Sequence, residues 1–307
     1  MKSKRIIGVF GFILAAVLAW LVWSSGIATV DHEAAGVLDG KRNGMPFSIV
    51  IGGEVNLDMI WIEPGTFKMG SSKSELGRFD GESLHKVKLT KGYWLGKYEV
   101  TQAQYEAIME TNPSHFKGAD NPVEKVNWND AMAFCKKLTE LERAAGRLPE
   151  GYEYTLPTEA QWEYACRAGT TTAFNNGTNI STEEQVYDEP CPGMDEVGWY
   201  AYNSDDRTHP VGQKKPNAWG LYDMHGNVFE WCSDLSGNYP TKSMISYLFK
   251  PVIDPMGPSV NHYLNHVVRG GSWSDRANGC RSAYRDNSYY NSFDRYGGFR
   301  VALAPVQ

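Results

Sequence analysis

The sequence predicts a folded chain of helices and short strands with many ordered turns, rather than a helical bundle. The 31 glycines and 15 prolines favour turns and ordered loops. A supply of 10 Trp, 17 Tyr and 12 Phe is enough for an extensive core. Helical periodicity is confined to the stretch near residues 101–168, whereas residues 169–305 show short β-like runs. Hydrophobic content of 42% and charged content of 21% exclude disorder and collagen-like order.

The N-terminus predicts a membrane anchor within residues 1–30. Residues 6–23 are uncharged and apolar, and they follow the basic segment at residues 1–5. At 1.5 Å per residue they cross most of a hydrocarbon core of about 30 Å. The basic flank holds that end in the cytoplasm, so we expect an extracytoplasmic protein, periplasmic in a bacterium. Cleavage near residues 26–28 would make it secreted, and a buried core helix is the alternative for the apolar run.

The remaining chain divides into a linker with a leading strand at residues 31–56 and one domain at residues 57–307. The formal charge of −6 gives no attraction to phosphate backbones, so nucleic acid is not an expected partner. Five cysteines without a C-x-x-C pair argue against a zinc ribbon or a thioredoxin-like motif. Their odd number leaves at least one free thiol in a monomer.

Short strands are predicted at the start of the domain. Residues 59–62 and 66–69 are apolar or alternating and flank the turn residues 63–65. A second strand pair is expected at residues 85–90 and 93–100.

Three helices follow. Thr101 and Gln104 form a capping box for a helix that stops before the Asn-Pro pair at residues 112–113. The second helix begins near Asn127 or Asn129. Its expected buried face, at helical spacing, consists of Ala131, Phe134, Cys135, Leu138 and Leu141. The third begins at the capping box of Thr158 and Gln161 and is expected to end at Gly169; its buried face is Trp162, Ala165 and Cys166.

The segment GLYDMHGNVFEW at residues 220–231 is the densest group of candidate ligands. Asp223 and Glu230 offer hard carboxylate oxygens, and Gly226 allows a tight fold that turns carbonyls towards one centre, which suits Ca²⁺. The alternative is a glycine turn in which Asp223 and Asn227 bond local amides. His225 is expected to be a hydrogen-bonded structural residue rather than a ligand.

Three other patterns have structural interpretations. His262 and His266 have the i, i+4 spacing of paired ligands, but no acid lies between them and nearby prolines favour a loop. Glu159 and Glu163 on the third helix are expected on a solvated face. The arginines near residues 269–300 lie among paired glycines and are expected to be buried or bidentate partners of carboxylates.

Taken together, these segments resemble the formylglycine-generating enzyme (sulfatase-modifying factor) family. The matches are WIEPGTFKMG (61–70), YEVT (98–101), PV and VNW (122–128), LPTEAQWEYA (156–165), GLYDM and GNVFEW (220–231), RGGSW (269–273) and GFR (298–300). The resemblance covers residues 57–304 and implies a single compact α+β domain related to the C-type lectin fold, with sparse regular structure and bound calcium.

The resemblance also implies site residues. The family's calcium loop corresponds to the side chain of Asp223, the carbonyls of Gly226 and Val228, and the carboxylate of Glu230, with Asp in place of the more usual Asn. Family oxidases hold Cu(I) between two cysteines separated by four residues, and soft thiolates are what Cu(I) requires. The first copper position here is Asp275, a hard ligand, so copper at that position is not expected.

The remaining catalytic candidates of the family pattern are Ser272 and Cys280, which matches the second copper cysteine when counted forward from Ser272. Counted backward from the GFR segment, the position falls near Ala277. The resemblance also allows a disulfide between Cys166 and Cys280. The family partner expected for Cys135 is absent.

Two functions follow. The first is a calcium-braced accessory or binding module that presents loops near residues 170–210 and 235–265 to a protein, peptide or glycan partner, such as a sulfatase. The alternative is an active oxidase that converts a sulfatase cysteine to formylglycine, with Cys232 or Cys191 replacing the missing thiol. The related iron-dependent sulfoxide synthases need an additional helical domain, for which no residues remain.

Overall fold

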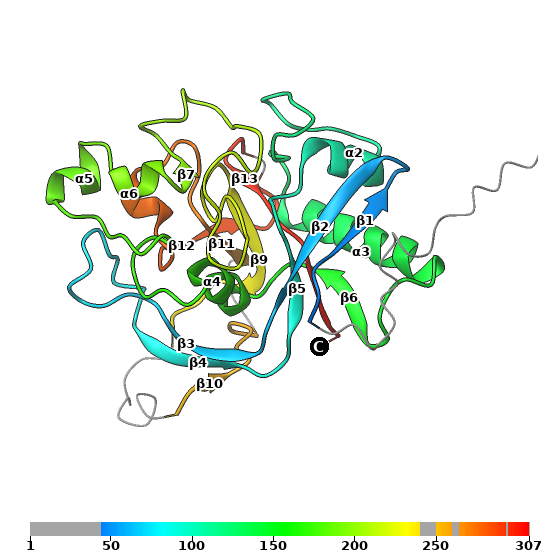
Figure 1. Cartoon of the computed structure of the whole chain (residues 1–307), viewed down its shortest axis with the longest axis horizontal. Coiled ribbons are helices and arrows are strands. Elements are labelled where there is room, and N and C mark those ends of the chain that lie inside the picture. Colours follow the sequence, from blue (N-terminus) through cyan, green and yellow to red (C-terminus); the bar gives the residue numbers. More distant parts are fainter. Residues whose placement is uncertain (1–43, 240–249, 260–263, 293, 307) are drawn as a thin grey trace, which may run out of the picture. The chain divides into compact units, whose positions relative to one another are not determined.

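The structure is a computed structural model that describes residues 44–239, 250–259, 264–292 and 294–306 (Figure 1). The predicted anchor at residues 6–23, residues 31–43 of the predicted linker and His262 lie outside these ranges. Within them, no helix combines the length and the apolarity that crossing a bilayer requires.

An antiparallel sheet of five strands brings together residues from both ends of the described chain. Its order is β1-β2-β5-β14-β6, so the last strand lies between two strands from the first half of the sequence. The strands are β1 (Phe47–Ile51), β2 (Val55–Ile62), β5 (Tyr93–Gly96), β6 (Tyr152–Thr155) and β14 (Ala302–Pro305).

The predicted early strands exist, but the two strands of each predicted pair do not pair with each other. The chain instead runs from the first strand of the pair into the second, which lies in a different sheet. Strand β2 pairs with β5, and β3 (Gly65–Met69) pairs with β4 (His85–Leu89). The turn at residues 63–64 therefore bends the ribbon from one sheet into another. Strand β10 (Val252–Ile253) adds to β4 in parallel and completes a sheet ordered β10-β4-β3.

The glycine-rich second half forms a four-stranded sheet and a two-residue strand pair. The sheet is ordered β12-β11-β9-β13, and β7 pairs with β8. The strands are β7 (Gly198–Trp199), β8 (His225–Gly226), β9 (Phe229–Leu235), β11 (Asn265–Arg269), β12 (Arg285–Tyr289) and β13 (Gly297–Gly298). Here the predicted scarcity of helices is confirmed.

All three predicted capped helices are confirmed. They are α2 (Gln102–Met109), α3 (Trp128–Ala144) and α4 (Glu159–Arg167), with capping boxes at Thr101, Asn127 and Thr158. The shorter helices are α5 (Glu183–Tyr187), α6 (Pro192–Asp195) and a 3₁₀ turn, η1 (Ala277–Cys280). Helices α2 and α3 lie beside the five-stranded sheet (Figure 1), where Tyr105 and Phe134 pack on Phe299.

Two details of the helices differ from the prediction. Leu141 is 47% exposed, because in the last turns of α3 the buried position passes to Glu142, whose carboxylate Arg147 binds. Helix α4 ends at Arg167, and Ala168 takes the left-handed cap conformation that was expected at Gly169. Gly169, with φ of 94°, continues the turn.

Candidate functional site

The loop at residues 223–230 folds back on itself through left-handed backbone. Asp223, Gly226 and Asn227 have φ of 56°, 75° and 60°. A Cβ at Gly226 would lie 1.9 Å from the carbonyl oxygen of Trp199, so only glycine fits this position. The loop contains β8 and enters β9, and all of its residues except Phe229 are buried, which places its polar groups away from solvent.

Asp223 is buried and only half satisfied. Its Oδ2 accepts a hydrogen bond of 2.7 Å from the backbone N–H of Gly212, whereas its Oδ1 has no partner among the described residues. Burial raises the pKa of this carboxyl to about 6, and repulsion by Glu230 adds to the rise although Arg300 opposes it. A buried oxygen without a hydrogen-bond partner is the property expected of a cation ligand.

Glu230 is also buried, and most of its hydrogen-bonding capacity is used. Arg300 donates from Nε to Oε2 at 2.6 Å and from Nη2 to Oε1 at 2.7 Å, and Trp162 donates from Nε1 to Oε2 at 2.7 Å. An ionised carboxylate offers about four lone-pair sites, so one remains, on Oε1. Arg300 thus shares this carboxylate with any cation in the loop.

Glu99 is a third buried carboxylate, which the sequence analysis did not assign to the site. Its Oε2 accepts from Nδ2 of Asn227 at 2.7 Å, and its Oε1 accepts from the N–H of Val228 at 3.1 Å. Burial raises its pKa well above the usual range, and Asp223 and Glu230 add to the rise. The available signal was its place in the YEVT segment at residues 98–101.

These contacts differ from the simple glycine turn considered as an alternative. Asp223 bonds Gly212, and the Asn227 side chain accepts from the N–H of His209 at 3.0 Å and donates to Glu99. All three partners are distant in sequence. The loop therefore ties several chain segments together.

No three His, Cys, Asp or Glu side chains in the described ranges converge as metal ligands. A cation held by Asp223 and Glu230 would consequently depend on backbone carbonyls too, as at Gly226 and Val228 in the set implied by the resemblance. The guanidinium of Arg300 acts on both Asp223 and Glu99, and the ammonium group of Lys214 also acts on Asp223. The unpartnered oxygen of Asp223 is a hard donor of the kind that Ca²⁺ prefers, so the donor chemistry fits Ca²⁺.

Ser272, Asp275 and Cys280 lie together in a tight turn before and within η1. Asp275 Oδ2 accepts hydrogen bonds from the backbone N–H of Ser272 at 3.0 Å and from its hydroxyl at 2.5 Å. The side chains of Ser272 and Cys280 have no exposed surface. Burial raises the pKa of the Cys280 thiol well above its usual range, and Asp275 adds to the rise, so this thiol is neutral.

The disulfide between Cys166 and Cys280 that the resemblance allowed is wrong for this structure, in which all five cysteines are free and buried. Cys166 instead contacts the hydroxyl of Ser282 at 3.5 Å. His225 separates the two thiols in the hydrogen-bond network: its Nε2 lies 3.8 Å from Sγ of Cys166 and its Nδ1 2.7 Å from the carbonyl oxygen of Cys280. Burial lowers the pKa of His225 to about 4, which fits a neutral structural histidine.

The prediction that Glu159 and Glu163 face solvent is wrong. Both are buried, because arginines from distant strands bind them: Arg269 reaches Glu159 at 3.1 Å and Glu163 at 2.6 Å, and Arg285 binds Glu159 at 2.8 Å. In the same way Arg281 binds Glu82 at 2.6 Å. The expected role of these arginines as buried carboxylate partners is therefore confirmed.

The histidine pair does not form a helical ligand set in the described chain. His262 lies outside the described residues. His266 belongs to β11, where its Nδ1 lies 3.2 Å from the carbonyl oxygen of Ser233 and its ring stacks on Trp128 at 4.0 Å.

Residues 53–305 match the family described as the sulfatase-modifying factor enzyme 1-like domain. The chain belongs to the sulfatase-modifying factor family. The Asp223 loop and the buried arginines of this chain lie inside the matched range. Solved relatives confirm the mixed α+β architecture.

Several relatives of this sulfatase-modifying-factor chain are known. A protein named Chaperone protein LppX from Paenibacillus barcinonensis is 30% identical over 80% of this chain and 89% of its own length. The formylglycine-generating enzyme of Bos taurus is 32% identical over 80% of this chain and 74% of its own length. Among solved structures, Treponema denticola variable protein 1 superposes with a TM-score of 0.70, at 29% identity, covering 85% of this chain and 99% of that one. PvdO from Pseudomonas aeruginosa superposes with a TM-score of 0.68 at 26% identity, covering 86% of this chain and 99% of that one.

The copper site of the sulfatase-modifying factor oxidases does not fit the residues present here. Asp275 offers a hard carboxylate oxygen that Ser272 already occupies, whereas Cu(I) prefers soft sulfur donors. Cys280 is enclosed and neutral. A linear dithiolate cannot form from this pair of side chains.

Proposed function

We propose that this sulfatase-modifying-factor protein is an accessory or binding module rather than an oxidase, with a scaffold braced by Ca²⁺. The single observation that carries the proposal is the hydrogen-bonded pair of Ser272 and Asp275 at the first copper position. Removing the carboxylate would leave the buried Ser272 without its acceptor, so Asp275 serves the local fold.

The surroundings of Cys280 support the same conclusion. Cys191 belongs to the same apolar cluster and influences Cys280 electrostatically, but both thiols are buried. Burial raises the pKa of Cys191 as well, so neither supplies a thiolate at neutral pH. A peptide cysteine would have no open path to either sulfur.

Support for calcium comes from Asp223 and its neighbours. Its Oδ1 is an unused, buried oxygen, and Glu230 retains one lone pair on Oε1. Bound Ca²⁺ would favour the charged form of these buried carboxyls and fix the loop at residues 223–230. Its role here is structural, since Arg300 and Trp162 already hold Glu230 in place.

The partner in this proposal is a protein or peptide, such as a sulfatase or another exported protein, with a glycan as the alternative. The relative named as a chaperone protein supports a protein partner. We place the protein outside the cytoplasm, anchored or secreted, on the basis of the apolar run at residues 6–23.

The deciding experiment incubates the full chain with Cu(I), O₂ and a peptide that contains a sulfatase Cys-x-Pro-x-Arg motif, followed by mass spectrometry. A formylglycine-generating enzyme treated in parallel is the positive control. We expect the peptide cysteine to remain unmodified by this chain while the control produces aldehyde. Aldehyde formed by this chain would establish the oxidase alternative.

A further inference from the structure

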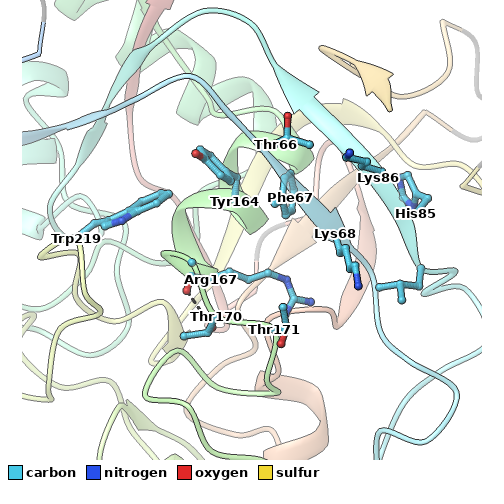
Figure 2. A pocket seen from close by; sticks show the side chains of 12 residues that line it. Thr66, Phe67, Lys68, His85, Lys86, Tyr164, Arg167, Thr170, Thr171 and Trp219 are labelled. Carbon is cyan, nitrogen blue, oxygen red and sulfur yellow. Dashed lines mark hydrogen bonds between the residues drawn. The ribbon is translucent and has the colours of Figure 1, made fainter. Parts of the chain in front are cut away.

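A hollow of about 700 Å³ lies away from the Ser272 and Asp223 sites (Figure 2). Strands β3 and β4 form one wall, and helix α4 and the segment after it form the other. The side chains used below are Thr66, Phe67, Lys68, Lys86, Tyr164 and Trp219.

Three aromatic rings give the hollow an apolar wall. Tyr164 lies between the other two, with ring centroids 5.1 Å from Phe67 and 4.9 Å from Trp219. Figure 2 shows Tyr164 on α4 beside Phe67 on β3. All three rings are partly exposed, so a visiting apolar side chain can reach them.

Two lysines on the neighbouring strands face each other without a counter-charge. Lys68 and Lys86 are opposite residues in the antiparallel register of β3 and β4, so their side chains are on the same face, about 5 Å apart at Cβ. Both are exposed, and neither forms an ion pair with any described residue. Like charges in this position repel, and an acidic group from outside would relieve the repulsion.

The backbone beside the hollow is also free to bind. Strand β3 is the outer strand of the sheet ordered β10-β4-β3, and no described residue hydrogen-bonds the outer edge of Gly65–Met69. The strand is held in place at its end, because the N–H of Gly70 donates to Glu163 at 2.8 Å and its carbonyl accepts from Arg167 at 2.8 Å. A rigid, unpaired edge is a template for strand addition.

We propose that this hollow binds an extended acidic peptide of a partner protein, which adds to β3 as a further strand. The peptide backbone pairs with the outer edge of β3, and side chains alternate along it. One set of side chains places an aromatic ring against Tyr164 and Trp219, and the other places carboxylates near Lys68 and Lys86. This inference rests on the proposed binding function and identifies its surface and the chemistry of the partner.

The alternation of rings and lysines favours a peptide over a glycan. A polyanionic glycan satisfies lysines but has no regular backbone N–H and C=O groups for a strand edge. The domain itself is acidic overall, with 36 acidic and 30 basic residues in the chain, which makes this lysine pair a local exception. Selection of an acidic segment therefore follows from a specific surface and not from net charge.

The test uses the full chain and a fluorescein-labelled probe with the sequence Glu-Tyr-Glu-Phe-Glu, followed by fluorescence anisotropy. The double variant Lys68→Gln/Lys86→Gln should weaken binding about tenfold, because two charge contacts are lost. The matched double variant Lys73→Gln/Lys136→Gln removes two exposed lysines elsewhere and should bind as the wild type does. Thermal unfolding of Lys68→Gln/Lys86→Gln should be unchanged or shifted upward, which separates loss of binding from loss of fold.

Two modified probes test the strand geometry. Methylation of alternate backbone nitrogens in one register should abolish binding, and methylation in the other register should be tolerated, because only every second N–H faces β3. Equal binding of a Lys-Tyr-Lys-Phe-Lys probe, indifference to both methylation registers, or preferential binding of dextran sulfate would each overturn the inference. These outcomes leave the aldehyde assay unaffected, so failure of this surface is distinct from failure of the proposed function.

Discussion

The guanidinium of Arg269 donates a hydrogen bond of 2.6 Å from Nη2 to Oε2 of Glu163, and neither side chain has exposed surface. The other oxygen of Glu163 accepts from the backbone N–H of Gly70 and from Arg167. One carboxylate thus connects β11, α4 and the end of β3. Its burial is stable only because every one of these donors is in place.

Glu163→Gln should lower the free energy of unfolding by about 3–5 kcal/mol, because it leaves Arg269 buried without its full counter-charge. Urea denaturation followed by tryptophan fluorescence measures the change. Lys215→Ala is the control: it removes the exposed pair with Glu196 and should cost less than about 1 kcal/mol. Similar losses in both variants would contradict the importance of the buried pair.

Calcium should raise the melting temperature of the full chain, and EDTA should lower it, because a ligand bound only by the folded state stabilises that state. Asp223→Asn retains an oxygen ligand and should keep the response, whereas Asp223→Ala should lose it. Glu150→Ala removes an exposed carboxylate and serves as the control. If neither calcium nor EDTA changed the melting temperature of the wild type, the proposal of a cation at this loop would be contradicted.

The thiols should be unreactive in the native protein. Burial raises the pKa of Cys166 to about 12 and that of Cys280 well above its usual range, so Ellman's reagent should label neither quickly. In denaturant without reductant, five thiols should react. Ser72→Cys adds an exposed thiol that reports normal labelling. Three reactive thiols in denaturant would reveal a disulfide. Rapid labelling of Cys280 in the native protein would support the oxidase alternative.

Asp234 should make stability decrease as pH rises. Burial and repulsion by Glu159 raise its folded pKa to about 7, although the N–H of Glu159, the Ser233 hydroxyl and Arg285 favour the charged form. A raised carboxyl pKa means that the folded state binds more protons, so this contribution is full below about pH 4 and is lost by about pH 7. The loss is on the order of 1.4 kcal/mol per pKa unit.

The Asp234→Asn variant isolates this effect. It keeps an acceptor for Glu159 and cannot ionise, so its stability relative to the wild type should increase between pH 4.5 and 8 by a few kcal/mol. Urea denaturation at both pH values measures the difference. Asp120→Asn, at an exposed carboxyl without a side-chain partner in the described chain, should show no such trend. Parallel pH profiles for Asp234→Asn and the wild type would contradict the prediction.

The helices were predictable from sequence because their signals are local. Thr101, Asn127 and Thr158 each bond the third residue of their own helix, and such contacts are visible in the order of residues. The pairing of β2 with β5, and not with β3, was not predictable in this way, since it depends on contacts between residues more than 30 positions apart. The sequence thus predicted where strands occur but not which strands pair with each other.

The candidate site was recovered in part for the same reason. Asp223 and Glu230 stand out because a glycine lies between them in one short segment. Glu99 joins them from the segment that follows β5, much earlier in the sequence. The arginine that binds Glu230 lies 70 residues after it. Glu159 and Glu163 were misassigned because helical spacing cannot reveal that Arg269 and Arg285 cover them.

Strand β14 is an interior strand of the five-stranded sheet, between β5 and β6. Until residues 302–305 arrive, those two strands have no hydrogen-bonding neighbour on their facing edges. During synthesis this sheet therefore cannot close before residues 302–305 have been added. A nascent or prematurely terminated chain would expose two unpaired strand edges. Such a chain would therefore be a substrate for chaperones and proteases.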